Sequence, residues 1–111
     1  MKIKTSELTG AALDLEVAKC EATSLPAYSY STNWLFGGPI IEREKMKVYP
    51  NVGGTWSAQI RHEESHPLVS HKVIAGWTNS AGHTPLIAAM RCYVASKLGN
   101  EVEIPDGIIL I

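Results

Sequence analysis

A histidine-rich stretch in the middle of the chain has the spacing of a zinc site. His62-Glu63-Glu64-Ser65-His66 has the form H-E-x-x-H, which on a helix places two imidazoles on one face to hold zinc, with a glutamate as general base. The surroundings oppose a hydrolase, because the segment offers no apolar residue to bury a helix and meets Pro67 at once. His71 also comes one residue too early for the third ligand of the longer zincin motif. We therefore expect a solvated loop, with His62, His66 and His71 as weak metal candidates and a zinc-binding hydrolase as a remote alternative.

A second candidate site precedes a predicted short helix. Ser31, Thr32, Asn33 and Trp34, followed by Gly37 and Gly38, bring hydroxyls, an amide and two glycines ahead of Pro39, the expected first helical residue. Free backbone N–H groups at such a helix start favour an anion, so a phosphate or an acidic peptide could bind there, with Arg43 one turn on. Helix capping and tight backbone packing explain the same residues without a ligand, and we favour that interpretation.

Aromatic and basic residues could alternatively form a surface for nucleic-acid bases. The aromatic candidates are Trp34, Trp56, Trp77, Tyr28, Tyr30 and Tyr49, and the basic candidates are Arg43, Lys45, Lys47, Arg61 and Lys72. The expected order of elements from Pro39 to Leu98 resembles the double-stranded-RNA-binding domain, but the last helix carries no cation before Arg91. With 10 basic and 11 acidic residues the net charge is −1, so we favour aromatic residues in the core over a nucleic-acid platform.

Hydrophobic periodicity indicates which elements hold these residues. Residues 8–22 place apolar side chains on two helical faces, which predicts a first helix packed on two sides. A turn-rich connection with one helical turn around Asn33 follows, then a short helix from Pro39 to about Glu44 and a strand. Pro50 to Gly54 is a turn signal, so the strands on either side of it form a hairpin, and residues 72–77 supply a third strand.

The most regular pattern lies in residues 84–98. Thr84 is the expected N-cap, Pro85 the first helical residue and Gly99 the terminator. We expect the large residues to lie on the sheet and the small reverse face either to let another element approach closely or to meet solvent. The large residues are Leu86, Ile87, Met90, Tyr93, Val94 and Leu98, and the small ones are Ala88, Ala89, Cys92, Ala95 and Ser96.

These elements predict one α+β domain over residues 1–111. Its order is α-α-β-β-β-α, with a three-stranded antiparallel sheet packed by the N-terminal and C-terminal helices. The apolar C-terminal tail, residues 101–111, should be covered by its own domain or by a partner subunit. Cys20 and Cys92 fall in helical patterns, which indicates buried, reduced thiols. The predicted core includes Leu15, Ile41, Val48, Trp56, Ile60, Ile74, Leu86, Met90 and Val94.

Composition limits the cellular setting. The chain is 45% hydrophobic and 19% charged, which is typical of a folded globular protein and excludes intrinsic disorder. It has no secretory signal and no run of membrane-spanning length. We expect a cytoplasmic protein that does not associate with membranes.

Several stretches of the chain resemble the NinX family of lambdoid-phage accessory proteins. The similar segments are residues 1–10, 12–14, 31–34, 37–44 and 84–99. Asn33 stands where the family tends to have Asp, and residues 22–30 are short by comparison. The segment His62 to His71 matches no family motif. The Ser-Thr-x-Trp segment and the last helix are also similar to a broader phage α-β-α sandwich domain.

The resemblance implies a non-structural phage protein in an infected or lysogenic bacterial host, with no catalytic residue to carry over and no cofactor. We expect a non-enzymatic protein that acts by contact with a host or phage protein. Nucleic acid is the alternative partner, and a homo-oligomer formed through the C-terminal tail is a further option. Binding, if it involves the second candidate site, would use Ser31, Thr32, Asn33, Trp34, Gly37, Gly38 and Arg43, together with Trp56.

Overall fold

The computed structural model describes residues 1–23, 28–64 and 73–105, with the backbone alone for residues 62–64 and 73–75. The first half of the chain forms a short strand, a 3-10 turn and two helices: β1 Lys2–Lys4, η1 Thr5–Glu7, α1 Gly10–Cys20 and α2 Trp34–Arg43. The second half forms three strands, a helix and a short strand: β2 Lys47–Pro50, β3 Trp56–Glu64, β4 Val73–Gly82, α3 Pro85–Leu98 and β5 Glu101–Glu103.

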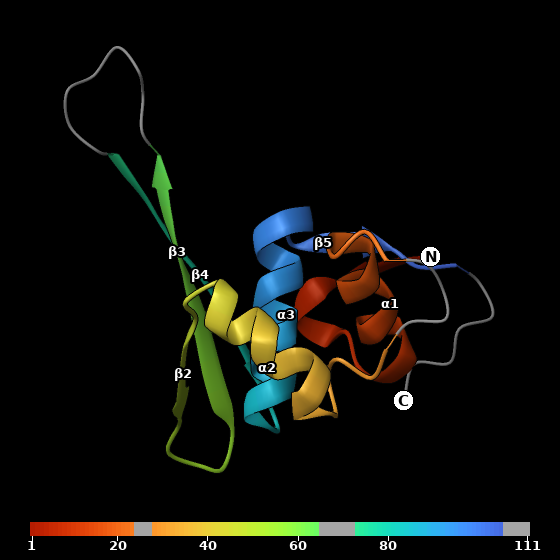
Figure 1. Cartoon of the computed structure of the whole chain (residues 1–111), viewed down its shortest axis with the longest axis horizontal. Coiled ribbons are helices and arrows are strands. Elements are labelled where there is room, and N and C mark those ends of the chain that lie inside the picture. Colours follow the sequence, from red (N-terminus) through yellow and green to blue (C-terminus); the bar gives the residue numbers. More distant parts are fainter. Residues whose placement is uncertain (24–27, 65–72, 106–111) are drawn as a thin grey trace.

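The long helix α3 lies at the centre of the fold. One side of it contacts the antiparallel sheet β2-β3-β4, while α1 and α2 also pack on it. Figure 1 shows the sheet at one side of the molecule and all three helices together on one of its faces. Among the described residues no helix covers the other face of the sheet, so the layering differs from the α-β-α sandwich to which the chain was compared.

The α+β class, the three helices and the three-stranded antiparallel sheet are confirmed. The complete order differs from the predicted one, because β1 and β5 form an additional two-stranded antiparallel sheet that joins the two ends of the described chain. Ile3 lies opposite Val102 in that sheet, and Ile104 N donates to Met1 O. Strands of three residues carry too short an alternation to be recognised from hydrophobic period. The first helix is also shorter than the predicted 8–22.

The predicted start of the second helix at Pro39 is wrong. The helix begins at Trp34, because the Asn33 side chain caps it by accepting from Leu35 N at 2.9 Å. Pro39 therefore lies inside the helix, and Gly37 and Gly38 are helical residues rather than a turn. A Cβ atom on Gly37 would overlap the Tyr30 carbonyl oxygen and lie 2.5 Å from Leu86 Cδ1. The glycine thus permits α2 to approach its neighbours closely.

The predicted cap, first residue and terminator of α3 are confirmed, but the predicted orientation of the helix is wrong. Thr84 Oγ1 accepts from Ile87 N at 3.1 Å, and Gly99 follows the last turn. Cys92, from the face of small residues, donates through Sγ to Thr78 O on β4. Tyr93, from the face of large residues, contacts the ends of α1 and α2 instead. Small residues thus let the helix approach the sheet, and large ones fill the wider space between helices.

The predicted hairpin is confirmed between β2 and β3. Asn51 N donates to Thr55 O at 2.8 Å across the turn, and Val48 lies opposite Ala58. The third strand is longer than predicted, since β4 runs from Val73 to Gly82 and pairs with β3 along its length. Because side chains alternate along a strand, Ala58 and Ile60 face α3, and Ser57, Gln59 and Arg61 lie on the outer face of the sheet.

The hydrophobic core is centred on α3 and α1. Of the predicted core residues, Ile60, Leu86, Met90 and Val94 are buried, and Ile41, Val48 and Trp56 are half-buried against them. Leu15 is outside this cluster, because it lies two residues after the buried Leu13 and so on the other side of α1. The side chain of Ile74 lies outside the described residues. The core members that the prediction missed are chiefly Leu8, Leu13, Val17, Tyr93 and Ile104.

The first part of the C-terminal tail is covered by its own chain. Val102 and Ile104 are buried, and residues 106–111 lie outside the described part. Neither Cys20 nor Cys92 forms a disulfide, and Cys92 is buried while Cys20 is half-buried. Burial raises the pKa of Cys92 to about 12, and burial with the nearby Glu16 and Glu21 carboxylates raises that of Cys20 to about 11.

Candidate functional site

An exposed apolar patch surrounds the start of α2. Trp34 is 54% exposed, Leu35 is 72% exposed and Tyr28, which precedes the helix, is 53% exposed. We call these three residues the α2 patch. Large apolar side chains that gather on a surface indicate a place where another molecule is bound.

The α2 patch is attached to a well-packed support. Tyr28 stacks on Phe36 with ring centroids 4.7 Å apart, and Phe36 in turn meets the edge of Tyr30, which is buried. The Trp34 ring lies against Gly38, where an added Cβ would be 3.7 Å from Cε3. Since the Asn33 cap also fixes the first turn, the exposed side chains project from an ordered backbone.

A small cavity lies beside the patch, between the starts of α2 and α3. Its volume is about 210 Å³, and its lining is mostly apolar. Ser31 is 2% exposed, its N–H donates to Asp14 Oδ1 at 2.8 Å, and its hydroxyl has no hydrogen-bond partner among the described residues. We call this cavity the socket; its lining residues are Ser31, Thr32, Trp34, Thr84, Leu86 and Ile87.

The structure gathers six of the eight predicted binding residues at this end of α2 and separates two. Ser31, Thr32, Asn33, Trp34, Gly37 and Gly38 lie at or next to the start of the helix. Arg43 is the last residue of the same helix, and Trp56 is half-buried at the start of β3. The alternative of an anion site before Pro39 lacks the required backbone, because the helix starts at Trp34 and its Leu35 N–H is already capped by Asn33. The favoured interpretation, helix capping and tight packing, agrees with this geometry.

Arg43 joins the three helices. Its guanidinium donates to both Glu21 oxygens at 3.0 and 2.7 Å, to Glu44 Oε2 at 2.9 Å and to the Tyr93 hydroxyl at 3.1 Å. The Tyr93 hydroxyl donates to Glu21 in turn. Hydrogen bonds from Arg43 and Tyr93 hold the pKa of Glu21 below its usual value, and burial together with the Glu21 bond raises that of Tyr93. The arrangement ties the ends of α1 and α2 to α3.

The H-E-x-x-H segment does not begin as a helix. The backbone of His62, Glu63 and Glu64 belongs to β3, so these three residues form a strand and neither the helix that the zinc motif requires nor the expected loop. His66 and His71 lie outside the described residues. Within the described part of the chain, no group of three or more His, Cys, Asp or Glu residues is placed to hold a metal ion.

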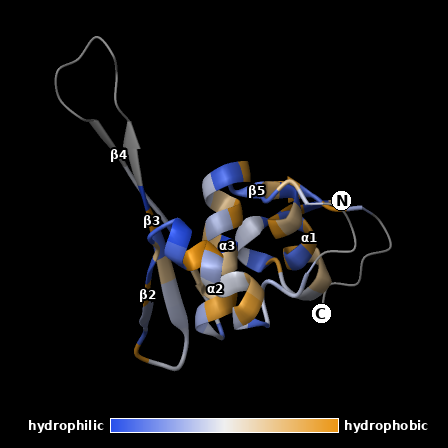
Figure 2. Ribbon diagram, viewed as in Figure 1, coloured by the Kyte–Doolittle hydropathy of each residue, from blue (hydrophilic) through white to orange (hydrophobic). Residues whose placement is uncertain are grey.

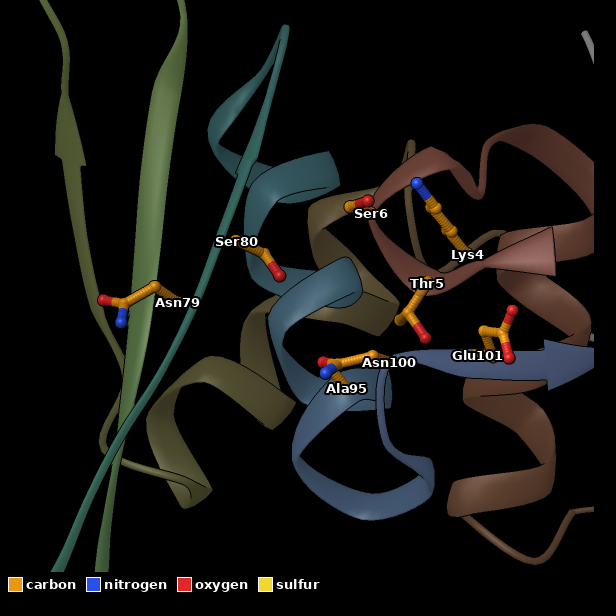
Figure 3. Close-up of a pocket in the computed structure, with 8 residues that line it drawn as sticks. All are labelled: Lys4, Thr5, Ser6, Asn79, Ser80, Ala95, Asn100 and Glu101. Atoms are coloured by element: carbon orange, nitrogen blue, oxygen red, sulfur yellow. The ribbon is translucent and has the colours of Figure 1, made fainter.

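A polar cleft of about 250 Å³ opens between β4 and the first and last strands (Figure 3). Ser80 points toward α3, whereas Asn79 points to the far side of the sheet. Thr5 Oγ1 donates to Gly99 O at 2.6 Å, so it is engaged in closing the chain ends together. The charged residues in the lining are Lys4 and Glu101, which are neighbours across the β1-β5 pair. The cleft offers hydrogen-bonding groups, and we base no reaction on it.

Comparison with protein families gives one match. The family model described as bacteriophage P22, NinX matches residues 22–97, which is more than half of the chain. The chain belongs to the NinX family. No curated protein matches it at a significant level. The matched residues hold α2, the whole sheet β2-β3-β4 and nearly all of α3, so they include the α2 patch and the socket. The resemblance read from the sequence is therefore confirmed.

NinX membership makes the chain a phage accessory protein. None of the helices in the described part is long and apolar enough to cross a membrane. The family description names no reaction and no partner, so we identify the candidate site from geometry alone. Leu35 and Phe36 were not predicted as site residues, because the sequence analysis assigned them to a connection. The signal that could have identified them is Asn33, a good N-cap residue that precedes apolar residues at helical spacing.

Proposed function

We propose that this NinX-family protein is non-enzymatic and acts in the host cytoplasm by binding another protein through the α2 patch and the socket. The observation that supports the proposal is the exposure of Trp34 and Leu35 on a capped and well-packed helix start. Binding energy in protein interfaces is concentrated in a few aromatic and apolar residues that pack centrally against the partner. A support that is already ordered lowers the entropy lost on binding.

The socket suggests how a partner would be held. A cavity of about 210 Å³ is smaller than the usual pocket for a small-molecule ligand, which holds about 300–1,000 Å³. Its size and its apolar lining fit one inserted apolar side chain of the partner. The partner is thus a protein with an exposed apolar anchor.

The test compares two matched substitutions of exposed apolar residues. Leu35→Asp changes the α2 patch, whereas Val52→Asp changes a fully exposed residue in the turn between β2 and β3. An acidic residue in the first turn of α2 suits the helix dipole, so L35D should keep the fold. Tagged wild-type and variant proteins are expressed in phage-infected host cells, and captured proteins are quantified by mass spectrometry.

We expect a specific partner to be retained by wild type and V52D and reduced at least about tenfold by L35D, as for loss of an interface hot spot. Equal retention by both variants would show that the α2 patch is not the contact. Sedimentation of the purified protein distinguishes self-association from binding of a foreign partner. If wild type forms a homo-oligomer and L35D does not, the partner at the α2 patch is a second copy of the chain. The nucleic-acid alternative concerns another surface, the outer face of the sheet.

A further inference from the structure

A groove on the sheet side of the molecule brings together positive charge from three segments. It has a volume of about 570 Å³ and is lined by Glu44, Lys45, Lys47, Arg61 and Trp77. Lys45 follows α2, Lys47 begins β2, and Arg61 and Trp77 are paired residues of β3 and β4. Figure 2 shows that the end of α2 beside the sheet is hydrophilic. We call this region the basic groove.

The Glu44 carboxylate in the basic groove is paired with two cations outside it, one of which, Arg43, it shares with Glu21. Glu44 Oε2 accepts from Arg43 Nε at 2.9 Å, and Oε1 lies 3.7 Å from Lys97 Nζ. Neither of these cations lines the groove. The groove therefore offers the Lys45 and Lys47 ammonium groups to an incoming ligand, and low-dielectric walls concentrate their field.

The described side chains on the outer face of the sheet extend the basic groove without adding a carboxylate. Lys47 lies opposite Gln59, which lies opposite Asn79, in one row across the three strands. Arg61 lies opposite Trp77, which is 51% exposed. Among the described side chains, the outward positions of β2, β3 and β4 include no carboxylate. Amides, cations and an exposed ring on a flat strand surface suit a ligand with phosphates and unpaired bases.

Lys45 holds a backbone position that favours glycine. The end of α2 is a Schellman turn, in which Met46 N donates to Ile41 O and Lys45 N donates to Glu42 O. Lys45 is its left-handed residue, with φ of +52°. Glycine would be unstrained there, whereas lysine is not. The Lys45 side chain lines the groove from this position.

We propose that the basic groove and the adjoining outer face of the sheet bind single-stranded nucleic acid. Lys45, Lys47 and Arg61 contact phosphates, and Trp77 stacks on an unpaired base. An acidic protein is the less suitable ligand, because lysine is depleted in protein interfaces and a protein offers no succession of bases to stack. This site is separate from the α2 patch, so the two proposals can fail independently.

The main test measures affinity for labelled single-stranded DNA, single-stranded RNA and duplex of about twenty nucleotides by fluorescence anisotropy, starting near about 50 mM salt. Either single strand should bind more tightly than the duplex. Lys47→Gln should reduce the slope of log affinity against log salt by about 0.7, the value for one single-strand phosphate contact. Lys2→Gln removes a charge on β1, away from the groove, and should leave the slope unchanged.

Trp77 and Lys45 give tests that a purely electrostatic surface would not pass. Trp77→Ala should weaken binding roughly fivefold to a hundredfold, and Trp77→Phe should restore most of it, because any aromatic face can stack. Lys45→Gly should raise the melting temperature and weaken binding. Its matched control is Ala22→Gly, at a position of φ +56° in the corresponding turn after α1, which should raise the melting temperature and leave binding unchanged.

The proposal is overturned if no single strand binds at low salt, or if K2Q weakens binding as much as K47Q. It is equally overturned if polyglutamate competes as well as the oligonucleotide and W77A binds like wild type, since the surface would then be a general polyanion contact. The melting temperature of every variant is measured, so that a variant that binds weakly because it is unfolded can be recognised.

Discussion

The two adjacent glycines of α2 should respond to the same substitution in opposite directions. Gly38→Ala should stabilise the protein, because an added Cβ would lie 3.7 Å from Trp34 Cε3, an ordinary contact distance. Replacing a helical glycine by alanine contributes up to about 1 kcal/mol. Pro39 reduces that gain, because a proline disfavours a helical backbone at a preceding residue that carries a Cβ. Gly37→Ala also has a helix gain, but its Cβ would overlap the Tyr30 carbonyl oxygen and lie 2.5 Å from Leu86 Cδ1.

The size of the difference follows from which atoms can move. Overpacking costs about 1–3 kcal/mol, and the upper end applies at Gly37 because a backbone carbonyl cannot rotate away as a side chain can. After the helix gain, G37A should lose about 2 kcal/mol and G38A should gain no more than about 1 kcal/mol. The two variants should therefore differ by about 2–3 kcal/mol, or about 8–12 °C in melting temperature for a domain of this size.

Urea unfolding followed by circular dichroism measures both variants against wild type. An unchanged dependence on denaturant would show that the free energy of unfolding, and not the cooperativity, has changed. If G37A proved as stable as G38A, the close approach of α2 to Tyr30 and Leu86 would be wrong, and the socket built from the same contact would be wrong with it.

Three further predictions concern strain and ionisation. K45G and A22G should each stabilise the fold by about 1 kcal/mol in urea unfolding, because both residues have left-handed backbone angles. The Arg43 hydrogen bond lowers the pKa of Glu21, so the ionised Glu21 stabilises the fold above about pH 4.5, the ordinary pKa of a glutamate, and this stabilisation is lost as the pH falls. The free energy of unfolding of the Glu21→Gln variant should therefore fall less on acidification than that of wild type. Cys92, with a pKa of about 12, should react with a thiol reagent at about pH 8 only as fast as the protein unfolds.

Most of the helical and strand content could be predicted because local signals were strong. Thr84, Pro85 and Gly99 bound α3 as residue preferences suggest, and the turn before Trp56 joins two strands as expected. The direction in which α3 faces could not be predicted. A helix that is buried on nearly all sides has no polar face to reveal its orientation, so side-chain size had to decide it, and size favoured small residues against the sheet.

Six of the candidate binding residues were predicted correctly to lie near the start of the second helix, but the position predicted for that start was wrong. Gly37, Gly38 and Pro39 are a turn signal in sequence, but Asn33 caps a continuous helix across them. Local residue preference was outweighed by the tight contact with Leu86, a residue far away in the chain. The strand pair β1-β5 was not predicted either, because no local sequence pattern indicates that two short segments at opposite ends of the described chain pair with each other.

The net charge of the chain and the local distribution of its charges lead to different expectations about nucleic-acid binding. A net charge of −1 disfavours nucleic acid only if the charges are evenly spread, and here they are not. Glu16, Glu101 and Glu103 line a shallow cavity beside α1 and β5, where Glu16 pairs with Lys19 and Glu103 with the N-terminal ammonium. The sheet lies at the opposite side of α3 (Figure 1). A ligand within about 10 Å of the basic groove, one screening length at moderate salt, is influenced by the lysines there and little by the distant carboxylates. The affinity of this protein for polyanions should therefore depend on which face is presented, and immobilising it through the end formed by β1 and β5 should preserve binding.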